Sequence, residues 1–196
     1  MIRSTWRRTT SVGVWLAATM LAACEPYPQM HGVMIDPPRD VAAFEFTLAS
    51  GTRWRSAPES GRPMVVFFGY THCPDICPTT LADWKRAKGR LGKEAERVRF
   101  VFVTVDPERD TPTIADAYAK QFDKDFVGVS GDSATTANML KAFGATAARE
   151  SAVDPRNYLV GHTASAFLVD AKGRLIAMYP PGIGWEALAD DLEKVL

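Results

Sequence analysis

Two cysteines four positions apart are the residues of this chain best suited to chemistry. Cys73 and Cys77 lie in the segment Phe-Phe-Gly-Tyr-Thr-His-Cys-Pro-Asp-Ile-Cys-Pro (67–78), where an apolar strand should give way to a helix. Residues at this spacing share one helical face, and the free N–H groups of a first turn stabilise thiolates. Two adjacent thiolates form either a redox couple or part of a soft-metal site. A purely structural disulfide is the weaker interpretation, because so short a loop constrains little of the unfolded chain.

The first 23 residues have the pattern of an export signal. A basic head precedes an apolar run over 12–23, which is too short to span a membrane. The run ends in Leu-Ala-Ala-Cys (21–24) and resembles the lipobox of bacterial lipoproteins, which implies that Cys24 carries a lipid. An ordinary cleaved signal peptide and a short uncleaved anchor are the alternatives. We expect a lipid-anchored protein on the periplasmic or extracytoplasmic face of a bacterial cell membrane.

Composition indicates one globular domain that does not bind nucleic acid. Removal of residues 1–23 leaves 20 basic and 23 acidic side chains, whereas phosphate binding needs clustered Lys and Arg. Residues 24–40 contain four prolines and few apolar side chains, so they are interpreted as a tether. Residues 41–196 have the length of one domain with a full core. If Cys24 is lipidated, Cys73 and Cys77 are the remaining cysteines.

Apolar periodicity predicts alternating strands and helices along this domain. Two short strands are expected near 44–48 and at Trp54, and residues 144–160 are expected to be irregular. The remaining strands are predicted at 64–69, 98–105, 126–130, 164–169 and 174–179, and helices at 73–91, 113–122, 133–143 and 184–196. This order predicts an α/β sandwich with a mixed central sheet flanked by helices, and it resembles the thioredoxin fold. The cysteines and Asp106 then follow neighbouring strands at the carboxyl edge of the sheet, where ligands bind.

His162 is the candidate third donor. It precedes the strand that begins near Ala164, at the place where thioredoxin-type oxidoreductases carry a proline. Two thiolates and one imidazole suit Cu(I) and can also hold Cu(II), whereas zinc prefers a fourth ligand.

Three segments together resemble the signature blocks of the SCO/SenC family: 67–79, 103–112 and 161–170. The resemblance implies a thioredoxin-like copper chaperone, not a turnover enzyme, whose copper ligands are Cys73, Cys77 and His162. It further implies delivery of one copper ion to the binuclear centre of cytochrome c oxidase subunit 2. Another periplasmic copper donor is a further candidate partner. Many family members have a transmembrane helix where this chain has its lipobox.

A thiol–disulfide oxidoreductase is the main alternative, with Cys73 and Cys77 as a redox-active disulfide that reduces the same subunit or another exported protein. A peroxidase of this fold is disfavoured, because Val66 and Tyr70 stand where peroxiredoxins have Pro and Thr.

Other polar residues have weaker cases. Asp106 and Asp110 flank a loop beside the cysteines and are candidates for supporting the site or forming an acidic docking rim. Asp106 could equally cap its own turn, and the stronger interpretation of Asp110 is that Asp-Thr-Pro (110–112) starts a helix. His72 is expected beside the site or on the surface. Met30, His31 and Met34 offer soft donors but are expected to be a coincidence within the tether.

Overall fold

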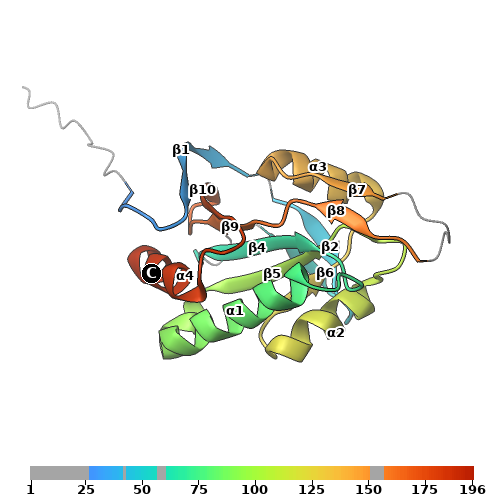
Figure 1. Ribbon diagram of the computed structural model, residues 1–196, viewed down its shortest axis with the longest axis horizontal. Coiled ribbons are helices and arrows are strands. Elements are labelled where there is room, and N and C mark those ends of the chain that lie inside the picture. The colour runs from blue at the N-terminus through green and yellow to red at the C-terminus, as the bar shows by residue number, and fades with distance from the viewer. Residues whose placement is uncertain (1–26, 42, 57–60, 151–156) are drawn as a thin grey trace, which may run out of the picture.

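The computed structural model describes residues 27–41, 43–56, 61–150 and 157–196. A six-stranded sheet forms its centre, in the order β1-β10-β9-β4-β5-β6 (Figure 1). The strands of this sheet are β1 (Val33–Asp40), β4 (Met64–Gly69), β5 (Arg99–Thr104), β6 (Val127–Val129), β9 (Ala166–Val169) and β10 (Arg174–Tyr179). The helices are α1 (Ile76–Leu91), η1 (Gly92–Arg97), α2 (Pro112–Phe122), α3 (Ser133–Phe143) and α4 (Trp185–Val195). Two hairpins, β2 (Glu45–Thr47) with β3 (Arg53–Arg55) and β7 (Ala147–Arg149) with β8 (Val160–His162), complete it.

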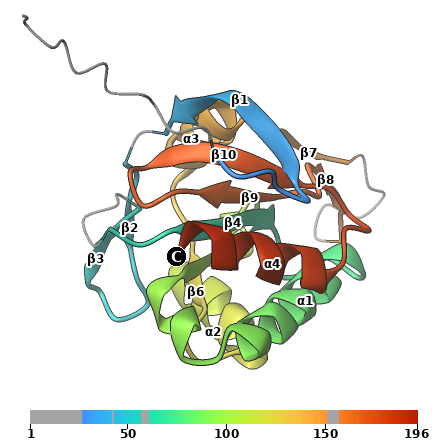
Figure 2. The ribbon, with the colours of Figure 1, turned by 90° about the vertical axis from the view of Figure 1, so that its left-hand side faces the viewer.

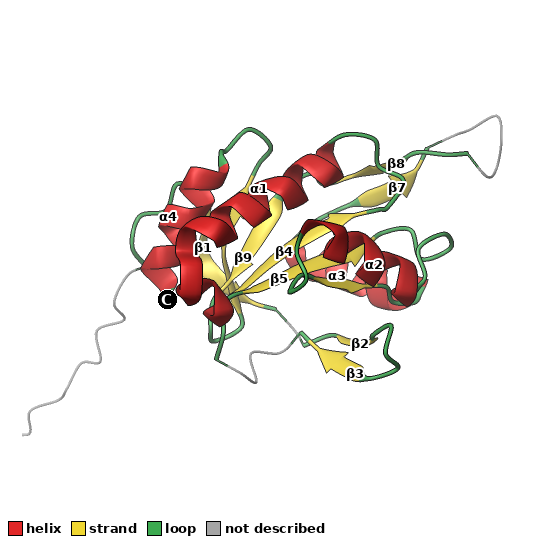
Figure 3. Cartoon of the chain, turned by 90° about the horizontal axis from the view of Figure 1, so that it is seen from below, coloured by secondary structure: helices red, strands yellow, loops and turns green. Residues whose placement is uncertain are grey.

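Strand β4 lies in the middle of the sheet and is buried on both faces. Val65 and Phe67 point into a core shared with α1, α2 and α4, whereas Val66 and Phe68 pack on the opposite side with α3. The continuous apolar run 64–69 is therefore the pattern of a strand covered on two faces. Figure 3 shows the helices on either side of the strands.

The predicted mixed sheet is confirmed. Strand β4 is parallel to β5 and antiparallel to β9, and β5 is parallel to β6. Because β4, β5 and β6 run the same way, the loops that follow them meet at one edge of the sheet.

The segment 144–160, predicted as irregular, contains β7 and the first residue of β8. Thr163 donates its N–H to the carbonyl of Thr146 at 2.9 Å and closes this hairpin beside the sheet. The strands have three residues each, too few for an alternating pattern to emerge from the sequence.

The tether predicted over 24–40 is wrong for residues 33–40, which form β1. This strand pairs with β10 through Val33–Met178 and Asp40–Arg174, with an irregularity between Met34 and Arg39. Pro37 and Pro38 lie within that irregularity. An edge strand tolerates proline there because its outer side has no ladder hydrogen bond to lose. The predicted signal peptide and Cys24 lie outside the described residues.

No helix in the described ranges is long and apolar enough to cross a membrane.

Candidate metal centre

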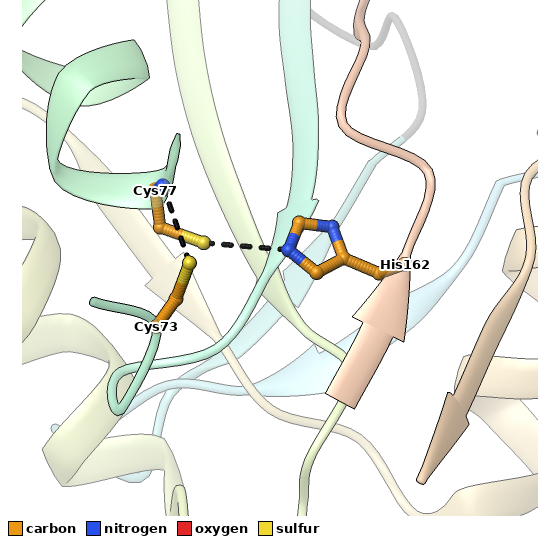
Figure 4. A group of neighbouring side chains, drawn as sticks. All are labelled: Cys73, Cys77 and His162. Atoms are coloured by element: carbon orange, nitrogen blue, oxygen red, sulfur yellow. Dashed lines mark hydrogen bonds between the residues drawn. The ribbon is translucent and has the colours of Figure 1, made fainter. Parts of the chain in front are cut away.

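Cys73, Cys77 and His162 come together at the carboxyl edge of the sheet. One donor atom from each residue lies within 4.8 Å of the other two (Figure 4). Two donors bound to one ion at about 2.0–2.3 Å each lie at most roughly 4.6 Å apart. Shifts well below 1 Å would therefore suffice for the three atoms to share one ion.

The two cysteines do not share a helix, in contrast to the prediction. Helix α1 begins at Ile76, so Cys77 occupies its first turn while Cys73 lies in the preceding loop. The Cys73 N–H donates to the carbonyl of Tyr70 at 3.2 Å, and the Cys77 N–H donates to the Sγ atom of Cys73 at 3.5 Å. The loop thus folds the first thiol back over the free amide end of the helix.

His162 ends β8 and presents its Nε2 atom to the cysteines. Nε2 lies 3.6 Å from the Sγ atom of Cys77, and Nδ1 lies 3.1 Å from the carbonyl oxygen of Thr163. Because a carbonyl only accepts, Nδ1 carries the proton and the Nε2 lone pair faces the sulfurs. The rings of Phe67 and Tyr70 pack edge-to-face against the imidazole, each with its centroid 5.8 Å from that of His162, and these contacts fix the plane of the imidazole.

Burial dominates the proton affinity of the site. It raises the pKa of the Cys77 thiol strongly, and the hydrogen bond with the Cys73 side chain and the charge of the Asp110 carboxylate add to that rise. Burial also lowers the pKa of His162 below its ordinary value of 6.5. The expectation that the helix end stabilises a thiolate is therefore wrong for Cys77, because desolvation outweighs the helix dipole there.

The donor set fits a soft, low-coordinate ion. Two sulfurs and one imidazole nitrogen suit copper. Within the described ranges, no other group of three or more His, Cys, Asp and Glu side chains brings its donor atoms together in this way. Both thiols are free, and Cys73 is partly exposed while Cys77 is fully buried. An ion held here would meet solvent or a partner on the Cys73 side.

Gly69 makes room for the buried sulfur. A Cβ atom at position 69 would lie 2.7 Å from the Sγ atom of Cys77 and 2.9 Å from ring atoms of Phe67 and Phe102. All three distances are below normal contact, so the last residue of β4 must lack a side chain for Cys77 to keep its position.

Asp110 supports the cysteine loop. The prediction that Asp-Thr-Pro (110–112) starts a helix is confirmed, because α2 begins at Pro112. The helix is capped by Thr111, whose hydroxyl accepts from the Ile114 N–H. The fully buried Asp110 carboxylate instead accepts from the N–H of Thr71 at 2.9 Å, from its hydroxyl at 2.5 Å and from the hydroxyl of Thr104 at 2.6 Å. These bonds connect β5 to the loop that carries Cys73.

Asp106 organises a cluster beside the site. Its carboxylate accepts from the Arg109 guanidinium and, at 2.7 Å, from the Tyr158 hydroxyl. The Arg109 guanidinium lies 3.6 Å from the centre of the Tyr158 ring and donates to the Tyr158 carbonyl at 3.0 Å. This cluster connects the loop after β5 to the chain entering β8. Sequence reasoning missed Arg109 and Tyr158, since no local pattern links them.

The remaining candidates do not belong to the group of three donors. His72 is exposed and its Nδ1 atom lies 3.8 Å from Asp110. Met30 packs against the core, and the Nε2 atom of His31 lies 3.4 Å from Asp190 on α4.

Comparison with known proteins bears on this arrangement. The sequence profile described as SCO1/SenC matches residues 33–196. The chain belongs to the SCO1/SenC family. A SCO2-like protein of Rickettsia felis is 33% identical over 134 residues, which cover 68% of this chain and 65% of that relative. About a third of that relative therefore lies outside the alignment.

Solved structures of SCO1/SenC proteins share the fold. Apo Sco1 from Thermus thermophilus matches with a TM-score of 0.78 and 37% identity, over 86% of this chain and 98% of that one. ScoI from Bradyrhizobium japonicum, solved with copper bound, matches with a TM-score of 0.72 and 35% identity, over 80% and 99% of the two chains.

Proposed function

We propose that this protein binds one copper ion through Cys73, Cys77 and His162 and delivers it to the binuclear copper centre of cytochrome c oxidase subunit 2. The observation that carries the proposal is that a ring nitrogen of His162 and the sulfurs of two free cysteines lie within 4.8 Å of one another. Membership of the SCO1/SenC family supports it, as does the copper-bound state of the Bradyrhizobium homologue.

Copper is the cargo in this proposal, and the chain supplies a site that is ready before the ion arrives. The lowered pKa of His162 keeps its imidazole neutral at neutral pH, so that donor needs no deprotonation. The raised pKa of Cys77 keeps it a thiol until a metal ion displaces its proton. Burial of Cys77 and partial exposure of Cys73 favour release by ligand exchange that starts at Cys73, where a partner thiol can enter.

The proposed location is the extracytoplasmic face of a bacterial cell membrane. Residues 1–23 would be removed as a lipoprotein signal peptide, and lipid on Cys24 would hold the domain there. A periplasmic copper donor would load the site. Asp106 and Asp110 are proposed to support it through the bonds described above.

A thiol–disulfide oxidoreductase is the second candidate, because both thiols are free and adjacent. In that reaction the Cys73 thiolate attacks a partner disulfide, and Cys77 then displaces the bound sulfur. The dithiol is oxidised to a disulfide while the partner gains two electrons and two protons.

Anaerobic titration of the reduced protein with Cu(I) and with Cu(II) tests the first candidate. We expect one ion per chain and a sulfur-to-Cu(II) charge-transfer absorption that is lost in Cys73→Ala, Cys77→Ala and His162→Ala. Tight copper binding that persists in His162→Ala would contradict the chaperone function and favour the oxidoreductase.

A further inference from the structure

The described chain begins with residues 27–32, which are hydrogen-bonded to the edge of the domain. We call these residues and their contacts the clasp. The hydroxyl of Tyr27 donates to Asp170 after β9 and accepts from Arg174 at the start of β10. The N–H groups of His31 and Gly32 donate to the buried Asp191 carboxylate at 2.7 and 3.0 Å. These contacts hold residues 27–32 before β1 begins.

The clasp continues on α4 and in the core. Lys194 donates to the carbonyl of Gln29 at 2.8 Å, and the side chains of Tyr27 and Met30 pack against the buried cluster under α1 and α4. Side-chain hydrogen bonds, main-chain hydrogen bonds and apolar packing thus all fix this segment. It is part of the domain.

Tyr27 lies at the sheet edge opposite the metal centre. Asp170 follows Val169, which pairs with Met64 at the start of β4, whereas Cys73 follows the end of that strand. Six residues of β4, at about 3.3 Å each, separate the two levels by roughly 20 Å. Figures 1 and 2 show the described chain entering on the side away from the start of α1.

The clasp leaves little free chain for an anchor at Cys24. Three residue steps from Cys24 to Tyr27 reach about 10 Å when fully extended. A free tether from 24 to 41 would reach about 58 Å and would permit any orientation of the domain. The clasp therefore brings one particular edge to the lipid surface.

The edge that carries the metal centre is more acidic than the opposite edge. The loops 70–75, 105–111 and 130–132 at the metal edge carry five carboxylates against one arginine. The segments 61–63, 92–97, 123–125 and 170–173 at the opposite edge carry five basic and five acidic side chains. An anionic bilayer therefore repels the first edge more strongly than the second.

We propose that the edge formed by the β9–β10 turn (170–173) and the ends of η1 and α4 contacts a phospholipid surface, with the metal centre directed away from it. This inference rests on the lipid anchor of the proposed function and extends it to an orientation. The site would then meet partner domains that project from the membrane, not segments buried at its surface.

The full lipidated chain in nanodiscs of phosphatidylglycerol and phosphatidylethanolamine tests this orientation. A gadolinium chelate on a fraction of the lipid headgroups broadens nearby methyl signals, and a lutetium chelate gives the diamagnetic reference. Labelled alanine methyls report both edges: Ala171 in the β9–β10 turn and Ala164 two residues after His162. We expect the relaxation enhancement at Ala171 to exceed that at Ala164 by more than an order of magnitude.

A matched variant carries twelve Gly and Ser residues between Pro26 and Tyr27, which lengthens the anchor without touching the clasp. We expect the difference between the two methyls to shrink severalfold in this variant. Equal enhancement at Ala171 and Ala164 in the natural chain would overturn the proposal.

Mass analysis and copper titration of the same sample separate this inference from the proposed function. A chain without lipid on Cys24 overturns the anchor and the orientation together but leaves copper binding standing. A lipidated chain that shows the expected difference between the two methyls but binds no copper would support the orientation and contradict the proposed copper-binding function.

Discussion

The Nε2 atom of His162 lies 3.6 Å from the Sγ atom of Cys77, although 85 positions separate the two residues. The sulfur comes from the first turn of α1, and the nitrogen comes from the end of a short hairpin strand beside the sheet. The site therefore exists only in the folded chain, and its properties depend on how firmly the hairpin and the helix are held together.

Replacement of His162 by Ala should weaken copper binding more than the loss of a supporting residue does. Mutation of a residue that is hydrogen-bonded to a metal ligand typically lowers metal affinity about 10–100-fold. Removal of the donor itself should therefore lower copper affinity by more than about 100-fold. Competition with a chelator of known affinity measures the change. Disulfide exchange with a model disulfide should proceed at a similar rate in this variant, because both thiols remain.

The two thiols should differ in reactivity. Cys73 is partly exposed, whereas Cys77 is fully buried and its pKa is raised by burial. Alkylation with iodoacetamide at about pH 8, followed by peptide mass analysis, should modify Cys73 at least about tenfold faster, since only opening of the fold exposes Cys77. Comparable rates at the two positions would mean that the helix end moves readily.

Stability of the metal-free domain should fall at both ends of the pH range. The folded-state pKa of His162 lies below 6.5, so its stabilisation is present above that value and is lost as the pH falls toward the lower folded pKa. The folded-state pKa of Cys77 lies above its ordinary value of 9.0, so its stabilisation is lost as the pH rises past 9.0. Urea denaturation across about pH 4–10, compared with His162→Gln and Cys77→Ser, measures each contribution. A His162→Gln profile that matches the natural one on the acid side would contradict the first assignment.

Removal of the Asp110 carboxylate should destabilise the cysteine loop. Asp110→Ala leaves three buried or half-buried donors on Thr71 and Thr104 without an acceptor, at a cost of about 3 kcal/mol or more. Asp110→Asn keeps the shape and should cost less. It should also lower the pKa of Cys77, because the Asp110 charge contributes to raising it. The free energy of unfolding and the pH dependence of Cys77 alkylation check the two effects.

A domain that starts at residue 41 should be less stable than one that starts at residue 27. The shorter chain loses β1 and the bonds to Asp170 and Asp191, each worth roughly 1 kcal/mol net, so we expect a loss of about 3 kcal/mol or more. Thermal and urea unfolding of the two chains measure the difference. Equal stability would show that β1 is an accessory to the domain.

Sequence patterns identified the central strands and the long helices, because their apolar periods are strong and local. Strand β1 was not predicted, because Pro37 and Pro38 are typical of a tether. Prolines are also tolerated in an irregular edge strand such as β1. The three metal-ligand candidates were found from residue type and order. The sequence did not predict that the pKa of Cys77 is raised. The helix-dipole argument considers only α1, whereas burial of the thiol depends on the residues that other elements pack over it.

The glycine that ends β4 has a consequence for natural variation. A single methyl group at position 69 would collide with the sulfur of Cys77 and with two aromatic rings at once. Exchange of Gly69 for alanine, among the mildest in side-chain volume, should therefore displace one ligand while the sheet around it stays paired. An allele with alanine at this position would yield a folded protein in which the displaced Cys77 weakens copper binding.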